Sequence, residues 1–157
     1  MFDAWEIPIE VLEETAAAFA RGDHEVFVLW ATALGEDDGT CRVVRCIVPD
    51  QQPGRTGLGV YVRMEGRELA RIQYENFDRK ERSVVQLHTH PSRDVDMSDL
   101  DRQWEVVNHV GALSVIVPRY GQDGLHGFPG VGVYEREPKH WRLWSGAEIG
   151  RRFRVVR

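Results

Sequence analysis

Apolar and polar residues recur along the chain with two different periods, and these periods predict its helices and strands. In residues 8–20 the apolar residues recur every three or four positions, which places them on one face of a helix. A proline at its start and glutamates in its first half favour this helix. Residues 25–34, EVFVLWATAL, are almost wholly apolar, as is typical of a central strand buried on both faces. The residues expected on the buried face of the helix are Ile9, Leu12, Ala16 and Phe19.

The rest of the chain continues this alternation of helices and strands. We expect further strands at residues 40–49, 59–63, 83–88, 113–118, 131–135 and 140–144. We expect one helix at residues 67–78, with Leu69, Ile72 and Phe77 inward, and one at residues 99–110, with Leu100, Trp104 and Val107 as its apolar stripe. The polar segment 50–57 and the glycine-rich segment 121–130 are expected to be loops. The pattern predicts one α/β domain over residues 1–157, with a mixed β-sheet and helices packed against it.

Composition and charge fit a globular protein with a substantial core. The chain has 157 residues, of which 42% are hydrophobic and 29% are charged, and its formal net charge of -5 argues against a nucleic-acid partner. The sequence contains neither an apolar run long enough to cross a membrane nor a recognisable signal peptide, so we expect a cytoplasmic protein. The basic segment 151–157, RRFRVVR, is typical of a solvated edge, although it could also contact an acidic partner.

The two cysteines are expected to be structural. Cys41 and Cys46 lie five positions apart in one predicted strand. An odd spacing along a strand places side chains on opposite faces, so the two are not expected to form a disulfide with each other. They also lack the spacing of a zinc knuckle.

The segment QLHTHPSRDVDMSDLD, which starts at Gln86, carries the chemistry that distinguishes this sequence. His88 and His90 stand at i and i+2 near the end of a strand, so both imidazoles point to one face and can bind one metal ion. Asp101 lies at the start of the next predicted helix, where its carboxylate can complete three protein ligands. Three ligands leave a tetrahedral zinc with one open position for water, as in catalytic sites, and bound zinc lowers the pKa of that water towards neutrality.

Each part of this segment also has a purely structural interpretation. A pair of histidines with this spacing is more often exposed or hydrogen-bonded than bound to a metal. Ser98 and Asp101 match a capping box at the start of a helix, with Ser98 as the cap and Asp101 at the third helical position. The two interpretations are compatible, because capping would itself hold Ser98 and Asp101 at fixed positions.

The complete spacing resembles the signature of the JAMM (MPN+, JAB, Mov34) zinc metallopeptidases. That signature is His-x-His-Pro, seven residues counted from the proline, and then Ser-x-x-Asp; His88, His90, Pro91, Ser98 and Asp101 occupy every fixed position. The order of predicted elements also agrees over most of the chain. The resemblance implies the JAB/MPN fold, which is related to that of the cytidine deaminases. It also implies one zinc ion, with a bound water, held by His88, His90 and Asp101.

The same resemblance implies the catalytic residues. The family needs a glutamate on an early strand after the first helix, and Glu25 stands there, although alone it would be read as a solvent-facing strand end. Glu25 would act as the general base, and the Ser98 hydroxyl would help to stabilise the oxyanion. Thr89 stands where serine is commoner in the family, but its side chain should point away from the metal.

Other histidine motifs match the sequence less well. His24 and Glu25 do not begin an HExxH helix, because position 28 is valine. The PHP phosphoesterases place their His-x-His pair at the start of the chain, and the zinc deaminases need a Cys-x-x-Cys pair that this sequence lacks. The remaining histidines are expected on the surface or in the core, although His126 could border the cleft.

The resemblance further implies cleavage after the C-terminal tail of a ubiquitin-like protein, from its conjugates or from its precursor. The tail could add as a strand beside residues 60–63 or the loop 50–57. The short chain resembles the prokaryotic JAB branch, often encoded beside activating and conjugating enzymes, including in antiphage defence operons. Two alternatives stay open: a JAMM hydrolase acting on a small sulfur-carrier protein, and a non-catalytic MPN scaffold that only binds partners.

Overall fold

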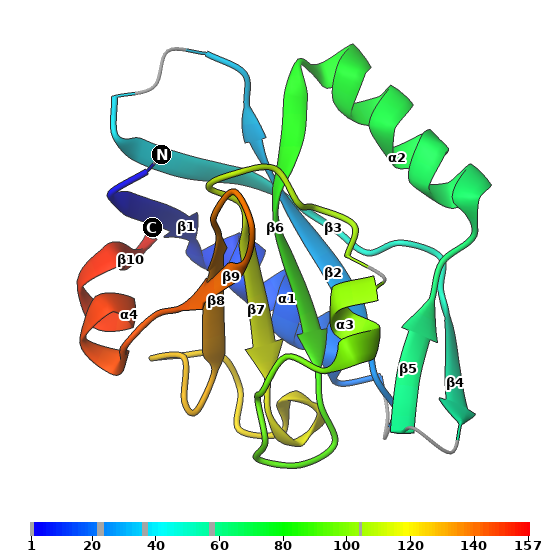
Figure 1. Cartoon of the computed structure of the whole chain (residues 1–157). Helices are drawn as coiled ribbons and strands as arrows, with labels where there is room; N and C mark the ends of the chain where they lie inside the picture. The colour runs from blue at the N-terminus through cyan, green and yellow to red at the C-terminus, as the bar shows by residue number, and fades with distance from the viewer. Residues whose placement is uncertain (1, 22–23, 36–37, 57–58, 104) are drawn as a thin grey trace.

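The elements of the computed structural model follow the predicted order over most of the chain (Figure 1). The structure describes residues 2–21, 24–35, 38–56, 59–103 and 105–157. The helices are α1 (Ile9–Phe19), α2 (Gly66–Arg79), α3 (Asp99–Gln103) and α4 (Gly146–Arg152), with a 3-10 turn, η1 (Arg119–Gly121). The strands are β1 (Ala4–Pro8), β2 (Phe27–Ala33), β3 (Thr40–Ile47), β4 (Gln52–Thr56), β5 (Gly59–Arg63), β6 (Glu81–Thr89), β7 (Leu113–Val117), β8 (Gly132–Arg136), β9 (Trp141–Leu143) and β10 (Phe153–Val156). Within these described ranges, no helix combines the length and apolar character needed to cross a membrane.

Eight of these strands form one mixed sheet, in the order β10-β1-β3-β2-β6-β7-β8-β9, and β4 and β5 form a separate hairpin. In the middle of the sheet, β2 pairs antiparallel with β6, and β6 pairs parallel with β7. In this register Phe27 lies opposite His88, so the beginning of β2 lies beside the end of β6. The mixed α/β architecture expected from the sequence is confirmed.

Helices cover the central strands on both faces, because alternate residues of a buried strand point to opposite sides. On one face, Leu12 of α1 shares a core cluster with Trp30 of β2, and Trp30 Nε1 donates to the buried Thr15 hydroxyl at 2.8 Å. On the other face, Leu29 of β2 packs with Ile72 of α2. Figure 1 shows α1 behind the central strands and α3 in front of them.

A β-bulge in β3 changes the expected position of the cysteines. The register between β2 and β3 shifts so that Val44 is an extra residue in β3. The bulge turns Cys46 to the face that Cys41 already occupies, and both side chains pack in the core beside α1. The expectation of opposite faces was therefore wrong. The described structure has no disulfide between these two thiols.

The segment 50–57 and helix α2 differ from the prediction, because polar residues there form a strand or are buried. The expected loop 50–57 contains the strand β4, which pairs with β5. Its Pro53 is tolerated because proline has no N–H and an edge strand leaves some backbone groups unpaired. In α2, Ile72 is buried as expected, but Phe77, expected inward, is 80% exposed. Glu68 is buried in α2 instead, because its carboxylate accepts a backbone amide of the preceding loop and binds a neighbouring arginine.

The helix expected at residues 99–110 is wrong in its length. Helix α3 ends at Gln103, and residues 105–110 are not helical. The amides of Val106 and Val107, which would bond to carbonyls four residues earlier in a longer helix, donate to the side chain of Gln86 instead. The apolar stripe proposed for this helix includes Trp104, which lies outside the described residues.

The sheet is extended by elements near both ends of the chain that the sequence pattern did not reveal. Strands β1 and β10 pair in parallel, with Trp5 opposite Phe153. The basic segment 151–157 therefore supplies the end of α4 and an edge strand, and it is not merely solvated. Phe153 is buried, with its ring centre 4.8 Å from that of Phe128 and 5.3 Å from that of Trp144.

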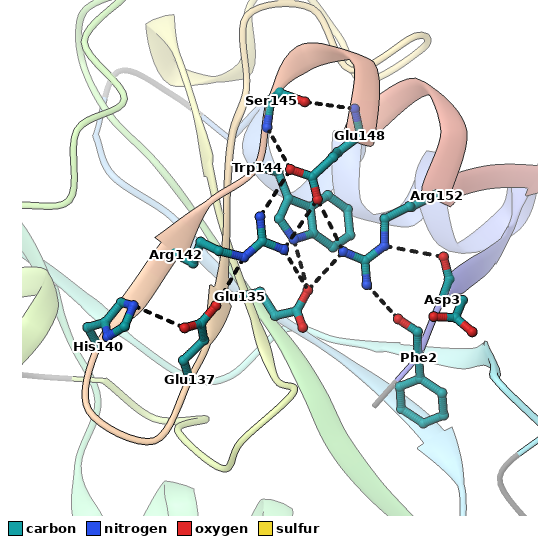
Figure 2. Close-up of polar contacts among 10 residues, drawn as sticks. All are labelled: Phe2, Asp3, Glu135, Glu137, His140, Arg142, Trp144, Ser145, Glu148 and Arg152. Atoms are coloured by element: carbon teal, nitrogen blue, oxygen red, sulfur yellow. Dashed lines mark hydrogen bonds and ion pairs between the residues drawn. The ribbon is translucent and has the colours of Figure 1, made fainter.

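A buried carboxylate, Glu135 of β8, connects the two ends of the sheet (Figure 2). Its Oε1 accepts hydrogen bonds from Trp144 Nε1 at 2.9 Å and from Arg152 Nη1 at 3.0 Å. Arg152 also donates to the carbonyls of Phe2 and Asp3, just before β1. Its guanidinium lies 4.1 Å from the centre of the Trp144 ring. The network therefore ties β8 and α4 to the first strand and holds the curled sheet together.

We expect Glu135→Gln to lower the free energy of unfolding by about 2–4 kcal/mol, because it removes the buried counter-charge of Arg152. Urea denaturation followed by circular dichroism measures this change. The control is Glu137→Gln, which removes a partner of Arg142 and His140 on the surface and should cost less than about 1 kcal/mol. Equal losses in the two variants would contradict a special role for the buried carboxylate.

Candidate metal centre

Three side chains meet at the end of β6 with their ligand atoms at the spacing of a metal site. His88 Nε2 lies 3.2 Å from His90 Nε2 and 3.0 Å from Asp101 Oδ1, and His90 Nε2 lies 3.2 Å from Asp101 Oδ2. A tetrahedral zinc with bonds of about 2.0–2.2 Å separates neighbouring ligand atoms by roughly 3.3–3.6 Å. The structure thus brings the three expected ligands together, with donor atoms close to the spacing that one such ion requires.

The two imidazoles reach this point from the extended end of β6. His88 lies in the strand itself and stacks on the ring of Phe27 in β2. The His90 amide donates to the Val117 carbonyl at 2.8 Å, which continues the pairing with β7 beyond the end of β6. His90 Nδ1 lies 2.9 Å from the carbonyl oxygen of Asp94. Because a carbonyl only accepts, Nδ1 carries the proton and the Nε2 lone pair faces the metal position.

Asp101 is oriented by a reciprocal capping box at the start of α3. The Ser98 hydroxyl accepts from the Asp101 amide at 3.0 Å, and Asp101 Oδ2 accepts from the Ser98 amide at 2.9 Å. The capping and ligand interpretations of this segment are therefore compatible. Burial acts to raise the pKa of Asp101, but its close contacts with the His88 and His90 rings outweigh it and hold that pKa well below its ordinary value. The carboxylate stays ionised, as a metal ligand must be.

Glu25 lies just before β2, and the two residues that follow it are fixed by hydrogen bonds to Thr89 and Gln51. The Val26 amide donates to the Thr89 hydroxyl at 3.0 Å, and the Thr89 amide donates to the Val26 carbonyl at 3.2 Å. The Gln51 carboxamide accepts from the Phe27 amide at 2.6 Å and donates to the Phe27 carbonyl at 2.8 Å. The Thr89 side chain therefore faces Val26 and not the histidine pair. These contacts fix the position from which the Glu25 side chain extends.

The environment of Glu25 suits a group that exchanges a proton near neutral pH. The residue is only 6% exposed, and burial raises the pKa of its carboxyl to about 7, with smaller and opposite effects from His90 and Asp101. Glu25 shares a cleft of about 30 Å³ with His88 and Asp101. That volume admits one or two water molecules. The other residues that line the cleft are Phe27, Val62, Met64, Gln86 and Leu100.

Ser98 and the other histidines occupy different surroundings. Ser98 is exposed, and its hydroxyl, while accepting from the Asp101 amide, can still donate its own proton. His126 is exposed on the loop before β8 and is not among the residues lining the cleft. His140 is 63% exposed beside Glu137. His109 lies in a separate groove, and burial lowers its pKa.

Several polar groups that orient the site were not recognised from the sequence. They are the carbonyl of Asp94 and the carboxamides of Gln51 and Gln86. Every residue has a backbone carbonyl, so the residue type does not reveal which carbonyl will face His90. Gln86, however, interrupts the otherwise apolar run SVVQL just before His88, and a polar residue inside a buried strand is itself a signal.

Comparison with known proteins shows likenesses in sequence and in fold. No protein-family model matches this chain. The chain is 27% identical over 134 residues to a protein of Sinorhizobium fredii (strain NBRC 101917 / NGR234) described as "Probable metalloprotease y4jG", which covers 85% of this chain and 80% of that relative. The solution structure of protein DSY2949 from Desulfitobacterium hafniense matches with a TM-score of 0.61 and 14% identity, over 97% of this chain and 92% of that one. The second likeness shows a shared fold alone.

The raised pKa of Glu25 predicts how the stability of the metal-free protein depends on pH. Because the folded protein holds this proton up to about pH 7 and the unfolded chain releases it near 4.5, the contribution of Glu25 to stability falls as the pH rises between these values. We therefore expect Glu25→Gln to become more stabilising, relative to the parent, by about 2 kcal/mol between pH 5 and pH 8.

Urea denaturation with a chelator present, at both pH values, measures this difference. The matched control is Glu10→Gln on the exposed side of α1, which should change the free energy of unfolding by less than about 0.5 kcal/mol at either pH. A Glu25→Gln effect that is the same at pH 5 and pH 8 would show that Glu25 is not desolvated.

Proposed function

We propose that this chain is a zinc-dependent peptidase or isopeptidase of the JAMM type. The observation that carries the proposal is that a buried carboxyl, Glu25, shares one small cleft with His88 and Asp101 of a three-ligand cluster. The spacing from His88 to Asp101 supports it, since it matches the JAMM signature at every fixed position. The relative described as a probable metalloprotease supports the metal-dependent peptidase class.

Zinc is the ion that best suits the ligands. Two imidazoles and one carboxylate form a nitrogen and oxygen set that zinc commonly occupies, and three protein ligands leave a position open for chemistry. When bound, zinc would supply Lewis acidity and would lower the pKa of water, so that a nucleophile able to attack an amide is available near neutral pH. The histidine Nε2 atoms and the Asp101 carboxylate would hold it.

Proton transfer falls to Glu25. Burial raises the pKa of this carboxyl to about 7 in the metal-free protein, and from this position Glu25 would accept a proton from the attacking water and return it to the departing amine. Ser98 can donate its hydroxyl proton to the oxygen that develops negative charge at the scissile carbonyl. Neither cysteine is needed as a nucleophile: Cys41 is buried, and burial raises the pKa of the Cys46 thiol beneath α1.

The proposed substrate is the extended C-terminal tail of a ubiquitin-like protein, in a precursor or in a conjugate. The hairpin of β4 and β5 supports this choice, because Val62 and Met64 at its end line the cleft beside Glu25. A tail that adds as a strand along this hairpin would bring its final peptide bond to the cluster. Activating and conjugating enzymes of the same modifier, encoded together in an antiphage defence operon, are the partners that fit such a peptidase.

We expect the zinc-loaded protein to cleave a fusion placed after the tail of its cognate ubiquitin-like protein. Glu25→Gln should lower kcat by about 10²–10⁴-fold, because the attacking water loses its proton acceptor. Chelation should abolish cleavage, and added zinc should restore it. Mass spectrometry of the released tails measures the cleavage. Glu14→Gln, on the exposed face of α1, is the matched control and should cleave like the parent.

Two other experimental outcomes would contradict this proposal and favour one of the alternatives. Cleavage confined to a small sulfur-carrier protein, with its tail trimmed or an amino acid released, would favour the JAMM hydrolase alternative. A purified protein without zinc, in which His88→Ala leaves partner binding unchanged, would favour a non-catalytic MPN scaffold. His140→Ala, at a histidine exposed beside Glu137, provides the control for loss of a histidine elsewhere.

A further inference from the structure

Gln86 is a buried polar residue whose side-chain amide both accepts and donates hydrogen bonds beside the candidate metal centre. It lies in β6 two positions before His88, on the same face of the strand, and only 3% of it is exposed. Its Oε1 accepts from the amides of Val106 and Val107, each at 2.9 Å. Its Nε2 donates to the hydroxyl of Ser114 in β7 at 3.3 Å. One carboxamide therefore joins β6, β7 and the chain that follows α3.

The segment that Gln86 binds follows directly after α3, the helix that carries Asp101. Helix α3 ends at Gln103, and the next described residues, from Glu105 to Val107, run back towards β6. Glu105 gives this segment a second anchor, because its carboxylate accepts from Trp141 Nε1 at 2.7 Å. The capping box fixes the beginning of α3, and the Gln86 contacts fix the segment after its end.

Removal of the Gln86 carboxamide would leave donors without partners in the interior. Val107 is buried and Val106 is partly buried, so their amides would lose hydrogen bonds that water cannot readily replace. The segment would then shift to find other partners. Because α3 is short, such a shift would be transmitted to the Asp101 carboxylate.

We propose that Gln86 is a positioning residue for the metal centre, which sets the distance from Asp101 to His88 and His90 by clamping the chain after α3. His88 and Gln86 belong to the same rigid strand, so the clamp and one metal ligand move together. The inference rests on the proposed metal-dependent function. It is separate from the roles proposed for Glu25 and Ser98, since the hydrogen bonds of the Gln86 side chain go to Ser114, Val106 and Val107.

The test compares Gln86→Met, which keeps the size and removes the acceptor, with Gln86→Glu, which keeps an acceptor for both amides. Zinc affinity is measured by competition with a chromophoric chelator. We expect Gln86→Met to bind zinc about 10–100-fold more weakly than the parent, as is typical when a group that orients metal ligands is lost. Gln86→Glu should recover most of that loss.

Amide hydrogen exchange of the metal-free protein gives a second readout. Exchange at Val106 and Val107 should quicken in Gln86→Met and stay slow in Gln86→Glu. The matched control is Ser114→Ala, which removes only the partner of Nε2 and should bind zinc within about threefold of the parent. If Gln86→Met does not fold, Gln86→Asn serves in its place, because the shorter amide cannot reach both donors.

A folded Gln86→Met or Gln86→Asn variant that binds zinc as tightly as the parent would overturn the inference. Weaker binding in Gln86→Glu to the same extent as in Gln86→Met would also overturn it, since the acceptor would then not be the cause. Failure of the proposed function looks different. In that case the parent protein binds no zinc, or it binds zinc and cleaves no ubiquitin-like fusion.

Discussion

Antiparallel pairing of β2 with β6 is the constraint on which the candidate metal centre depends. In such a ladder the beginning of one strand lies beside the end of the other, so the segment before Phe27 must lie beside His88. A slip of one residue in this pair would turn His88 towards α1 and away from α3. Buried apolar residues on both faces of the two strands oppose such a slip. The geometry of the site is therefore fixed by packing that takes no part in its chemistry.

Side chains complete the arrangement where the regular hydrogen bonding of the backbone ends. Each segment of the site leaves its strand or helix close to the metal position, and backbone groups there need new partners. Thr89 supplies them for Val26, and Gln51 supplies them for Phe27. Ser98 and Asp101 supply them for each other. The same bonds that satisfy the backbone also hold the site in one conformation, which reduces the entropy lost when an ion or substrate binds.

The parts of the site that could be predicted from the sequence lie within one short segment. The spacing of His88, His90, Ser98 and Asp101 is local, so the motif and its capping box can be recognised without a structure. Glu25 was found only through a family resemblance, because its approach to the histidines depends on strand pairing across some sixty residues of chain. Contacts between segments that are separate in the sequence also explain the errors. The face of Cys46 depends on a bulge, the end of α3 on Gln86, and the burial of Phe153 on the folding of β10 against β1.

The pairing of β1 with β10 has a consequence for the order in which the protein can fold during synthesis. β1 leaves the ribosome before the other strands of this sheet, whereas one of its two neighbours, residues 153–156, emerges after all of them. Until then the edge of β1 and the side chain of Trp5 lack part of their cover, and Arg152 has not reached the carbonyls of Phe2 and Asp3. The central strands can pair earlier, so a nascent chain can reach a stage in which the three candidate metal ligands are present but β1 is open to other chains. Protection of β1 by a chaperone would guard it against pairing with other chains in that interval.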